Sequence, residues 1–238
     1  MSIIQGTSGI DTLIGTAADD MINGDPATTT VTGLGPNRIS AGGGNDTVFA
    51  GYGADWVAGG GGNDVLVGAG SYAGPGQGGA ALALRDGADW LDGGAGNDLI
   101  SGAGGADTLI GGSGNDVLAG DWGDDLLRGG GDDDRLTGGL GADLMYGGAG
   151  RDVFVLGIAS APLASGLEAG QGAARDVIGD FARGQDLLDL SGIARAGGSW
   201  SWQATAEGVL VTVAAGAEVG EVLLRGLGTL GAGDVLWG

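Results

Sequence analysis

A nine-residue repeat constrains this chain more than any other feature of its sequence. The copies run in one frame from Gly93 to Val155, and six earlier copies share the pattern. A degenerate copy at 32–40 carries Asn37 where the others carry Asp. Position six is Asp in the remaining 13 of 14 copies: Asp11, Asp20, Asp46, Asp55, Asp64, Asp89, Asp98, Asp107, Asp116, Asp125, Asp134, Asp143 and Asp152.

Position eight of the repeat is apolar in every copy, from Leu13 to Phe154. One inward apolar residue between two outward residues describes a three-residue strand that follows a six-residue turn. A helical period of 3.6 residues fits neither this spacing nor the glycine content. Glycines at positions one, two and four allow the turn to adopt positive φ angles and bring carbonyl groups close to an ion. Two copies make one coil, with strands stacked about 4.8 Å apart.

The charged residues indicate what the turns bind. The 238-residue chain has 30 acidic residues, 9 basic residues and a formal net charge of −21. Only four acids are Glu, so 26 are Asp, whose short side chain is favoured in turns. Oxygen ligands of this kind suit calcium.

Missing residue types exclude several classes of function. The chain has no His, Cys or Lys. Zinc-peptidase motifs, Ser-His-Asp triads, thiol nucleophiles, disulfides, P-loops and Schiff-base lysines are therefore ruled out. A nucleic-acid partner is not expected, since phosphate binding needs clustered cations.

The repeat G-G-x-G-x-D-x-U-x resembles the repeats-in-toxin (RTX) family over residues 6–155. The resemblance implies an all-β fold, a right-handed parallel β-roll. It also implies that the position-six Asp residues of two turns one coil apart share a Ca²⁺ ion, with backbone carbonyls completing its shell. The implied ligands are Asp20, Asp46, Asp55, Asp64, Asp89, Asp98, Asp107, Asp116, Asp125, Asp134, Asp143 and Asp152.

Counting half-coils predicts where the ions lie. If residues 24–31 form one irregular half-coil and 68–83 form two, seven Asp pairs remain intact, most of them between Asp89 and Asp152. Asn37 then lies between Asp20 and Asp55 and weakens two sites, while Asp11 has no partner. Both interruptions should appear as gaps in the ion rows.

The chain divides into a calcium-binding roll, residues 1–155, and a C-terminal segment, residues 156–238. Residues 175–191 resemble the block that follows the roll in serralysin-type proteases, which implies a small β cap. Runs at 208–213 and 221–227 are the strands expected to complete it, and 159–172 is expected to be a mobile connection. The ending Asp234-Val235-Leu236-Trp237 resembles the tail read by type I secretion exporters, a possible partner. The N-terminus does not resemble a secretory signal peptide, and no segment is long and apolar enough to span a membrane.

Tryptophans offer a candidate ligand-binding surface. Trp56 and Trp90 occupy position seven, which points outward, and the half-coil count places them two coils, about 10 Å, apart. Leu126 and Leu144 extend the same face. The pair could stack sugar rings or dock a partner, or be covered by the cap or the loop at 71–83. Trp200 and Trp202 alternate with serines, as in a half-buried strand of the cap.

Three functions fit these observations. The first is a non-catalytic, secreted or surface-displayed calcium-binding module with a structural or adhesive role. The second is a virion or particle-surface decoration that binds cell-surface glycans. The third is an enzyme acting on a polysaccharide. In all three, calcium folds the chain outside the cell, because the stacked carboxylates repel one another and the core is thin.

Overall fold

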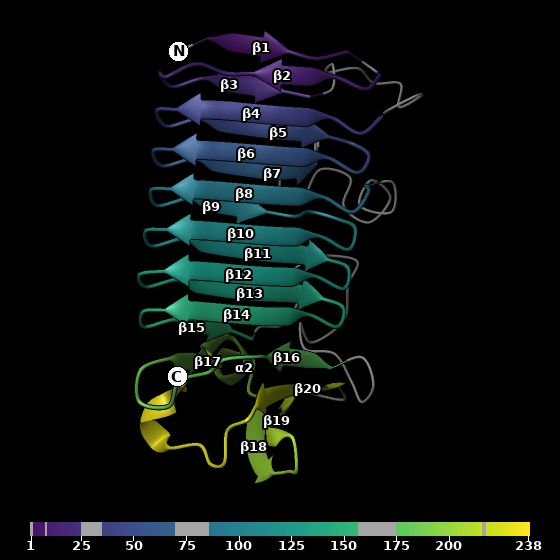
Figure 1. The fold of residues 1–238 in the computed structure, drawn as a ribbon. Helices are drawn as coiled ribbons and strands as arrows, with labels where there is room; N and C mark the ends of the chain where they lie inside the picture. The colour runs from purple at the N-terminus through teal and green to yellow at the C-terminus, as the bar shows by residue number, and fades with distance from the viewer. Residues whose placement is uncertain (1, 8, 25–34, 70–85, 157–174, 216–217) are drawn as a thin grey trace.

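The computed structural model describes residues 2–7, 9–24, 35–69, 86–156, 175–215 and 218–238. The strands form two sheets whose members alternate along the chain from β1 to β17, and in the roll every neighbouring pair within a sheet is parallel (Figure 1). Sheet A contains β1 (Ile3–Gln5), β3 (Met21–Asn23), β5 (Thr47–Gly51), β7 (Val65–Ala69), β9 (Leu99–Ser101), β11 (Val117–Trp122), β13 (Arg135–Leu140), β15 (Val153–Val155), β17 (Leu187–Asp189) and β21 (Val235–Leu236). Sheet B contains β2 (Thr12–Ile14), β4 (Arg38–Gly43), β6 (Trp56–Gly61), β8 (Trp90–Ala95), β10 (Thr108–Ser113), β12 (Leu126–Gly131), β14 (Leu144–Ala149), β16 (Asp176–Ile178), β20 (Glu218–Arg225), β19 (Gly208–Ala215) and β18 (Ser199–Ala204).

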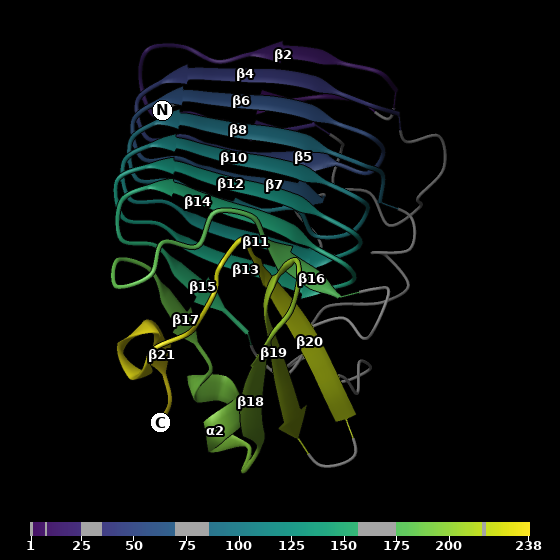
Figure 2. The same ribbon diagram turned by 60° about the horizontal axis from the view of Figure 1, so that its bottom comes forward.

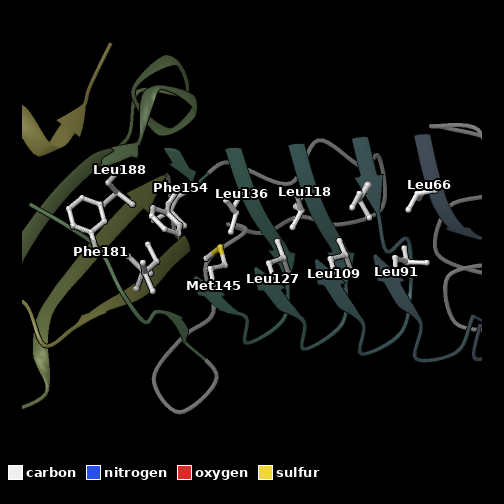
Figure 3. Packing of buried hydrophobic residues seen from close by; sticks show 14 of the residues in the cluster. Leu66, Leu91, Leu109, Leu118, Leu127, Leu136, Met145, Phe154, Phe181 and Leu188 are labelled. Atoms are coloured by element: carbon white, nitrogen blue, oxygen red, sulfur yellow. The ribbon is translucent and has the colours of Figure 1, made fainter. Parts of the chain in front are cut away.

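The expected parallel β-roll is confirmed. Position-eight residues of the two sheets point toward each other and form a single narrow core, seen as two rows in Figure 3. Thirteen of the fourteen position-eight side chains have no exposed surface, and the exception, Leu13 in the first coil, is partly buried. Phe181 and Leu188 continue the core beyond the last repeat.

The half-coil count at both interruptions is wrong. β3 and β4 are consecutive strands in opposite sheets, and so are β7 and β8. Neither insertion therefore adds a half-coil to the alternation of the strands. As a result β6 pairs directly with β8, and β7 with β9.

Position-two and position-four residues supply the positive φ angles of the turns. Gly112 and Gly114, for example, have φ of 116° and 111°. Non-glycine residues at these positions, Ala103, Asp121 and Asp132, keep the same sign of φ. Position one differs from the expectation, since Gly111 has no positive φ and instead leaves space: a Cβ on it would lie 2.2 Å from an Asp116 carboxylate oxygen.

Both sheets continue past residue 155. β16 pairs with β14 and β17 with β15, both in parallel, so the C-terminal segment extends the roll before it caps it. Antiparallel strands β18, β19 and β20 then extend sheet B, with the short helix α2 (Ser191–Arg195) beside them (Figure 2). The two strands expected at 208–213 and 221–227 correspond to β19 and β20. The 3₁₀ turn η2 (Ala232–Asp234) leads into β21, which is the last strand of sheet A.

Candidate metal centre

Position-six side chains form one continuous row along each edge of the roll. In each row, the backbone N–H of one position-six residue donates to the side-chain Oδ1 of the position-six residue one coil later, at 2.6 to 3.1 Å. The row before sheet B contains Asp11, Asn37, Asp55, Asp89, Asp107, Asp125, Asp143 and Asp176. The row before sheet A contains Asp20, Asp46, Asp64, Asp98, Asp116, Asp134, Asp152 and Asp186.

This arrangement changes the predicted pairing. All seven predicted Asp pairs are neighbours in these rows. Five further Asp pairs are also neighbours, because the insertions add no half-coil and the rows extend into the C-terminal segment: Asp20–Asp46, Asp55–Asp89, Asp64–Asp98, Asp143–Asp176 and Asp152–Asp186. The rows therefore have no gap at either insertion.

Asn37 interrupts the carboxylates of one row. Its neighbours are Asp11 and Asp55, not Asp20 and Asp55 as predicted, and Asp11 does have a partner. The Asn37 amide donates to the carbonyl of Ala50 at 3.0 Å. A neutral amide that already has hydrogen-bond partners does not offset the desolvation of a calcium ion as a carboxylate does.

The turns differ in whether the second carboxylate oxygen, Oδ2, of the position-six Asp accepts a hydrogen bond. In the middle of both rows Oδ2 is buried and accepts no hydrogen bond, although each of these residues is at most 3% exposed. Burying a charged oxygen without a partner is costly. The residues concerned are Asp46, Asp64, Asp89, Asp98, Asp107, Asp116, Asp125, Asp134 and Asp152.

The pKa values of these carboxyl groups reflect that cost. Burial raises the pKa of Asp64 and Asp116 to about 6 and the pKa of Asp107 and Asp134 to about 7. Neighbouring carboxylates act in the same direction. The roll therefore holds its carboxylates in places that favour either a proton or a cation.

Three turns at the ends of the rows satisfy this oxygen internally. In them the position-two N–H donates to Oδ2 within the same turn: Thr7 to Asp11 at 2.6 Å, Thr16 to Asp20 at 2.7 Å and Ala182 to Asp186 at 2.7 Å. None of these three donors has a positive φ. Hydrogen bonds from Ser2 and from the Thr16 hydroxyl, chief among several, lower the pKa of Asp20 to about 2. Asp20, a predicted calcium ligand, therefore already has donors on both oxygens.

Calcium fits the unpaired oxygens. Two oxygens converge on the space beside the Cα of Gly111. A Cβ placed there would lie 2.2 Å from Asp116 Oδ2 and 2.6 Å from the carbonyl oxygen of Gly129, one coil later. The same convergence occurs beside Gly120, with Asp125 Oδ2 and the Gly138 carbonyl. Within the described parts of the chain, no three Asp or Glu side chains form a ready metal-binding group. An ion beside these glycines would be bound by carboxylate and backbone carbonyl oxygens, a donor set suited to calcium.

Trp56 and Trp90 are closer than predicted. They are register partners on β6 and β8, with parallel rings whose centroids are 5.1 Å apart. The Arg38 guanidinium covers the other side of Trp56 at 4.9 Å. Both faces of Trp56 are thus occupied, which disfavours sugar stacking on that ring. Leu126 and Leu144 follow on the same face of sheet B. The loop at 71–83 lies outside the described residues, as does the connection predicted at 159–172.

The cap tryptophans have different environments. Trp200 is partly buried against the core and lies 6.4 Å, between ring centroids, from Trp237. Trp202 is 41% exposed. Of the two, Trp200 is the one that contributes to packing of the cap.

Comparison with known proteins agrees with this geometry. The sequence model of the RTX calcium-binding nonapeptide repeat matches residues 3–27, 31–66, 85–118 and 119–154, more than half of the chain. The chain belongs to the RTX calcium-binding nonapeptide repeat family.

Among solved structures, this RTX chain is similar to the AlgE6R3 subunit from the Azotobacter vinelandii mannuronan C5-epimerase. The two are 30% identical, the match covers 63% of this chain and 78% of that one, and the TM-score is 0.30. No curated protein matches the chain. Among the described residues, no helix has the length and apolar character needed to cross a membrane.

Proposed function

We propose that this RTX chain is a non-catalytic module that folds on calcium outside the cell and serves a structural or adhesive role at a surface. One observation carries the proposal: in the middle of both rows, nine buried carboxylates have a second oxygen without a hydrogen-bond donor. A row of this kind repels itself at neutral pH, and the core supplies one buried position per nine residues. Calcium binds the folded state and removes the repulsion, so its binding free energy becomes folding free energy.

The ions are assigned to neighbouring Asp pairs within a row. Seven pairs have both Oδ2 atoms without a donor: Asp46–Asp64, Asp64–Asp98, Asp98–Asp116, Asp116–Asp134, Asp134–Asp152, Asp89–Asp107 and Asp107–Asp125. Flow dialysis of the full chain with radioactive calcium should find seven or more ions per chain at saturation. A stoichiometry of one or two would contradict the assignment.

An extracellular location follows from the same dependence. Calcium is scarce inside cells and abundant outside, so the chain would remain unfolded until export and fold after release. RTX repeats are typical of extracellular proteins. Fractionation of the native cells in calcium-containing medium should recover the protein in the medium or on the surface. Recovery of the folded protein from the cytoplasm would argue against this role.

The non-catalytic part of the proposal has its own test. The acids of the rows are held in place by backbone hydrogen bonds between successive coils: the Asp98 N–H donates to Asp116 and the Asp116 N–H to Asp134. Incubation of the calcium-loaded chain with acidic polysaccharides should release no product and change no sugar configuration. Turnover of any of them would establish an enzyme instead.

A further inference from the structure

The N-terminal end of the roll is open, whereas the cap covers the C-terminal end (Figure 1). β1 and β2 are the first strands of sheets A and B, so neither has a partner strand on its outer side among the described residues. An edge strand of this kind presents backbone N–H and C=O groups with which a further strand can pair. The first coil therefore has the backbone groups needed to continue both sheets.

The apolar core is incompletely covered at this end. Ile4 and Leu13, the inward residues of β1 and β2, are only partly buried, whereas the inward residues from β3 to β15 have no exposed surface. Three isoleucines of the same coil are the most exposed large apolar side chains that the structure describes: Ile3 at 73%, Ile10 at 75% and Ile14 at 72%. Apolar groups that gather in this way mark a surface that another molecule covers.

Asp11 lacks the backbone donor that the rest of its row has. At every later place in both rows, Oδ1 of the position-six side chain accepts a backbone N–H from one coil earlier, at 2.6 to 3.1 Å. Asp20 accepts in the same way from Ser2, the residue before β1, at 2.7 Å. Within the described parts of the chain, Oδ1 of Asp11 accepts only the Thr7 hydroxyl, at 3.2 Å. An N–H of an added strand would complete the pattern.

Charge favours this end over the other surfaces of the molecule. The net charge of −21 makes two copies of the chain repel each other over most of their surface. Residues 1–14 contain a single charged side chain, that of Asp11. Two first coils can therefore approach each other with less repulsion than two acidic edges of the roll.

We propose that the N-terminal end of the roll binds the same end of a second copy of the chain, edge strand against edge strand, in a closed pair. In such a pair the exposed isoleucines of each copy cover Ile4 and Leu13 of the other, and each copy supplies edge N–H groups to the other. The opposite end has no matching surface, because Leu188 and Ile193 are fully buried there. The contact is separate from the assigned calcium pairs, and it adds self-association to the proposed function.

Sedimentation equilibrium of the calcium-loaded, full-length chain measures the association. The data should fit a monomer–dimer equilibrium with no larger species. Ile14→Asp introduces a charge twice in each pair, so it should raise the dimer dissociation constant by about a hundredfold. Its control is Leu99→Asp on β9, where Leu99 is 49% exposed in the middle of the roll, and it should change that constant by no more than about twofold. A monomer at every concentration, species that grow beyond a dimer, or equal dissociation of both variants would overturn the proposal.

Crosslinking identifies the ends that meet, because the chain has no Cys and one introduced thiol is unique. Ile10→Cys places the thiol at the open end, and Gly233→Cys places it in η2 at the other end, where a Cβ would meet nothing within 4 Å. A flexible bis-maleimide should link calcium-loaded Ile10→Cys into covalent dimers and leave Gly233→Cys monomeric. This readout stands even if Ile14→Asp does not fold on calcium. Failure to link Ile10→Cys, or equal linking of Gly233→Cys, would reject the pairing of the N-terminal ends.

Discussion

At the residue scale, the fate of each carboxylate depends on the residue at position two of its turn. Gly112 has a positive φ there, as Ala103 does, and the Asp four residues later, Asp116 or Asp107, keeps an Oδ2 without a hydrogen-bond donor. Thr16 lacks a positive φ, and its N–H and hydroxyl both donate to Asp20. The position-six pattern predicted calcium binding for twelve of the 13 Asp residues, Asp20 among them, and no partner for Asp11. The sequence shows Thr7 and Thr16 at position two of the turns that differ, but it does not show that they donate hydrogen bonds to the carboxylates.

The effect of an Asp substitution on calcium-induced folding should therefore depend on its position in the row. Asp116→Asn removes a ligand from two assigned sites, whereas Asp11→Asn alters a turn whose carboxylate accepts from Thr7 and borders Asn37. We expect calcium-induced folding of Asp116→Asn to need a severalfold higher calcium concentration. The midpoint of Asp11→Asn should stay close to that of the unaltered chain, as followed by circular dichroism. Equal midpoints for the two variants would contradict the assignment.

The pH dependence of the calcium-free chain has a definite sign. Burial raises the carboxyl pKa from an ordinary value of 3.8 to about 6 for Asp64 and about 9 for Asp89. The folded state thus holds protons that the unfolded chain loses, so this contribution to stability is complete below about pH 4 and is lost as pH rises through about 6 to 9. Asp20 has the opposite sign, because hydrogen bonds lower its pKa to about 2, but its effect lies below pH 3.8.

Calcium-stripped protein should accordingly gain β-structure when the pH falls from 8 to about 4.5. Far-ultraviolet circular dichroism in calcium-free buffer measures the change. With saturating calcium the signal should be nearly constant over the neutral range, which serves as the control. Loss of β-structure on acidification of the calcium-free chain would show that the buried carboxylates do not control its stability.

At the scale of the elements, the period of nine predicted the strands, their inward residues and the two-sheet roll. It did not predict how the insertions are accommodated, because residue number does not reveal whether an irregular stretch crosses to the other sheet. The structure shows that strand pairing passes each insertion without a break: β2 pairs with β4 and β3 with β5 across the first, and β6 with β8 and β7 with β9 across the second. Asp176 and Asp186 were overlooked for a related reason, since their spacing departs from nine although their strands join the same sheets.

The turns offer a matched test of backbone strain. Ala103 has φ of 72° at a position where glycine is usual. Ala103→Gly should raise the free energy of unfolding of the calcium-bound chain by about 1 kcal/mol, because alanine is strained in the left-handed region. Gly112→Ala should lower it by more, since the new Cβ would lie 2.1 Å from the Gly94 carbonyl oxygen. Denaturant unfolding compares them, and destabilisation by Ala103→Gly would refute this account of the turns.

At the scale of the whole molecule, the roll joins a thin apolar core to two rows of negative charge. The core is one side chain wide in each sheet and is closed at the C-terminal end by the cap (Figures 1 and 3). The tail Val235–Leu236 forms the last strand of sheet A, and Trp237 packs near Trp200. A tail read by an exporter would therefore be accessible before folding and become part of the sheet afterwards.

Calcium-dependent folding of the full chain tests the central claim most directly. Circular dichroism is recorded on protein treated with EDTA at pH 7.5, after addition of excess calcium, and after excess magnesium in place of calcium. The account predicts a largely disordered spectrum in EDTA, cooperative recovery of β-structure with calcium and poor recovery with magnesium, whose short octahedral bonds suit this donor set badly. A β-rich spectrum that EDTA leaves unchanged would contradict it.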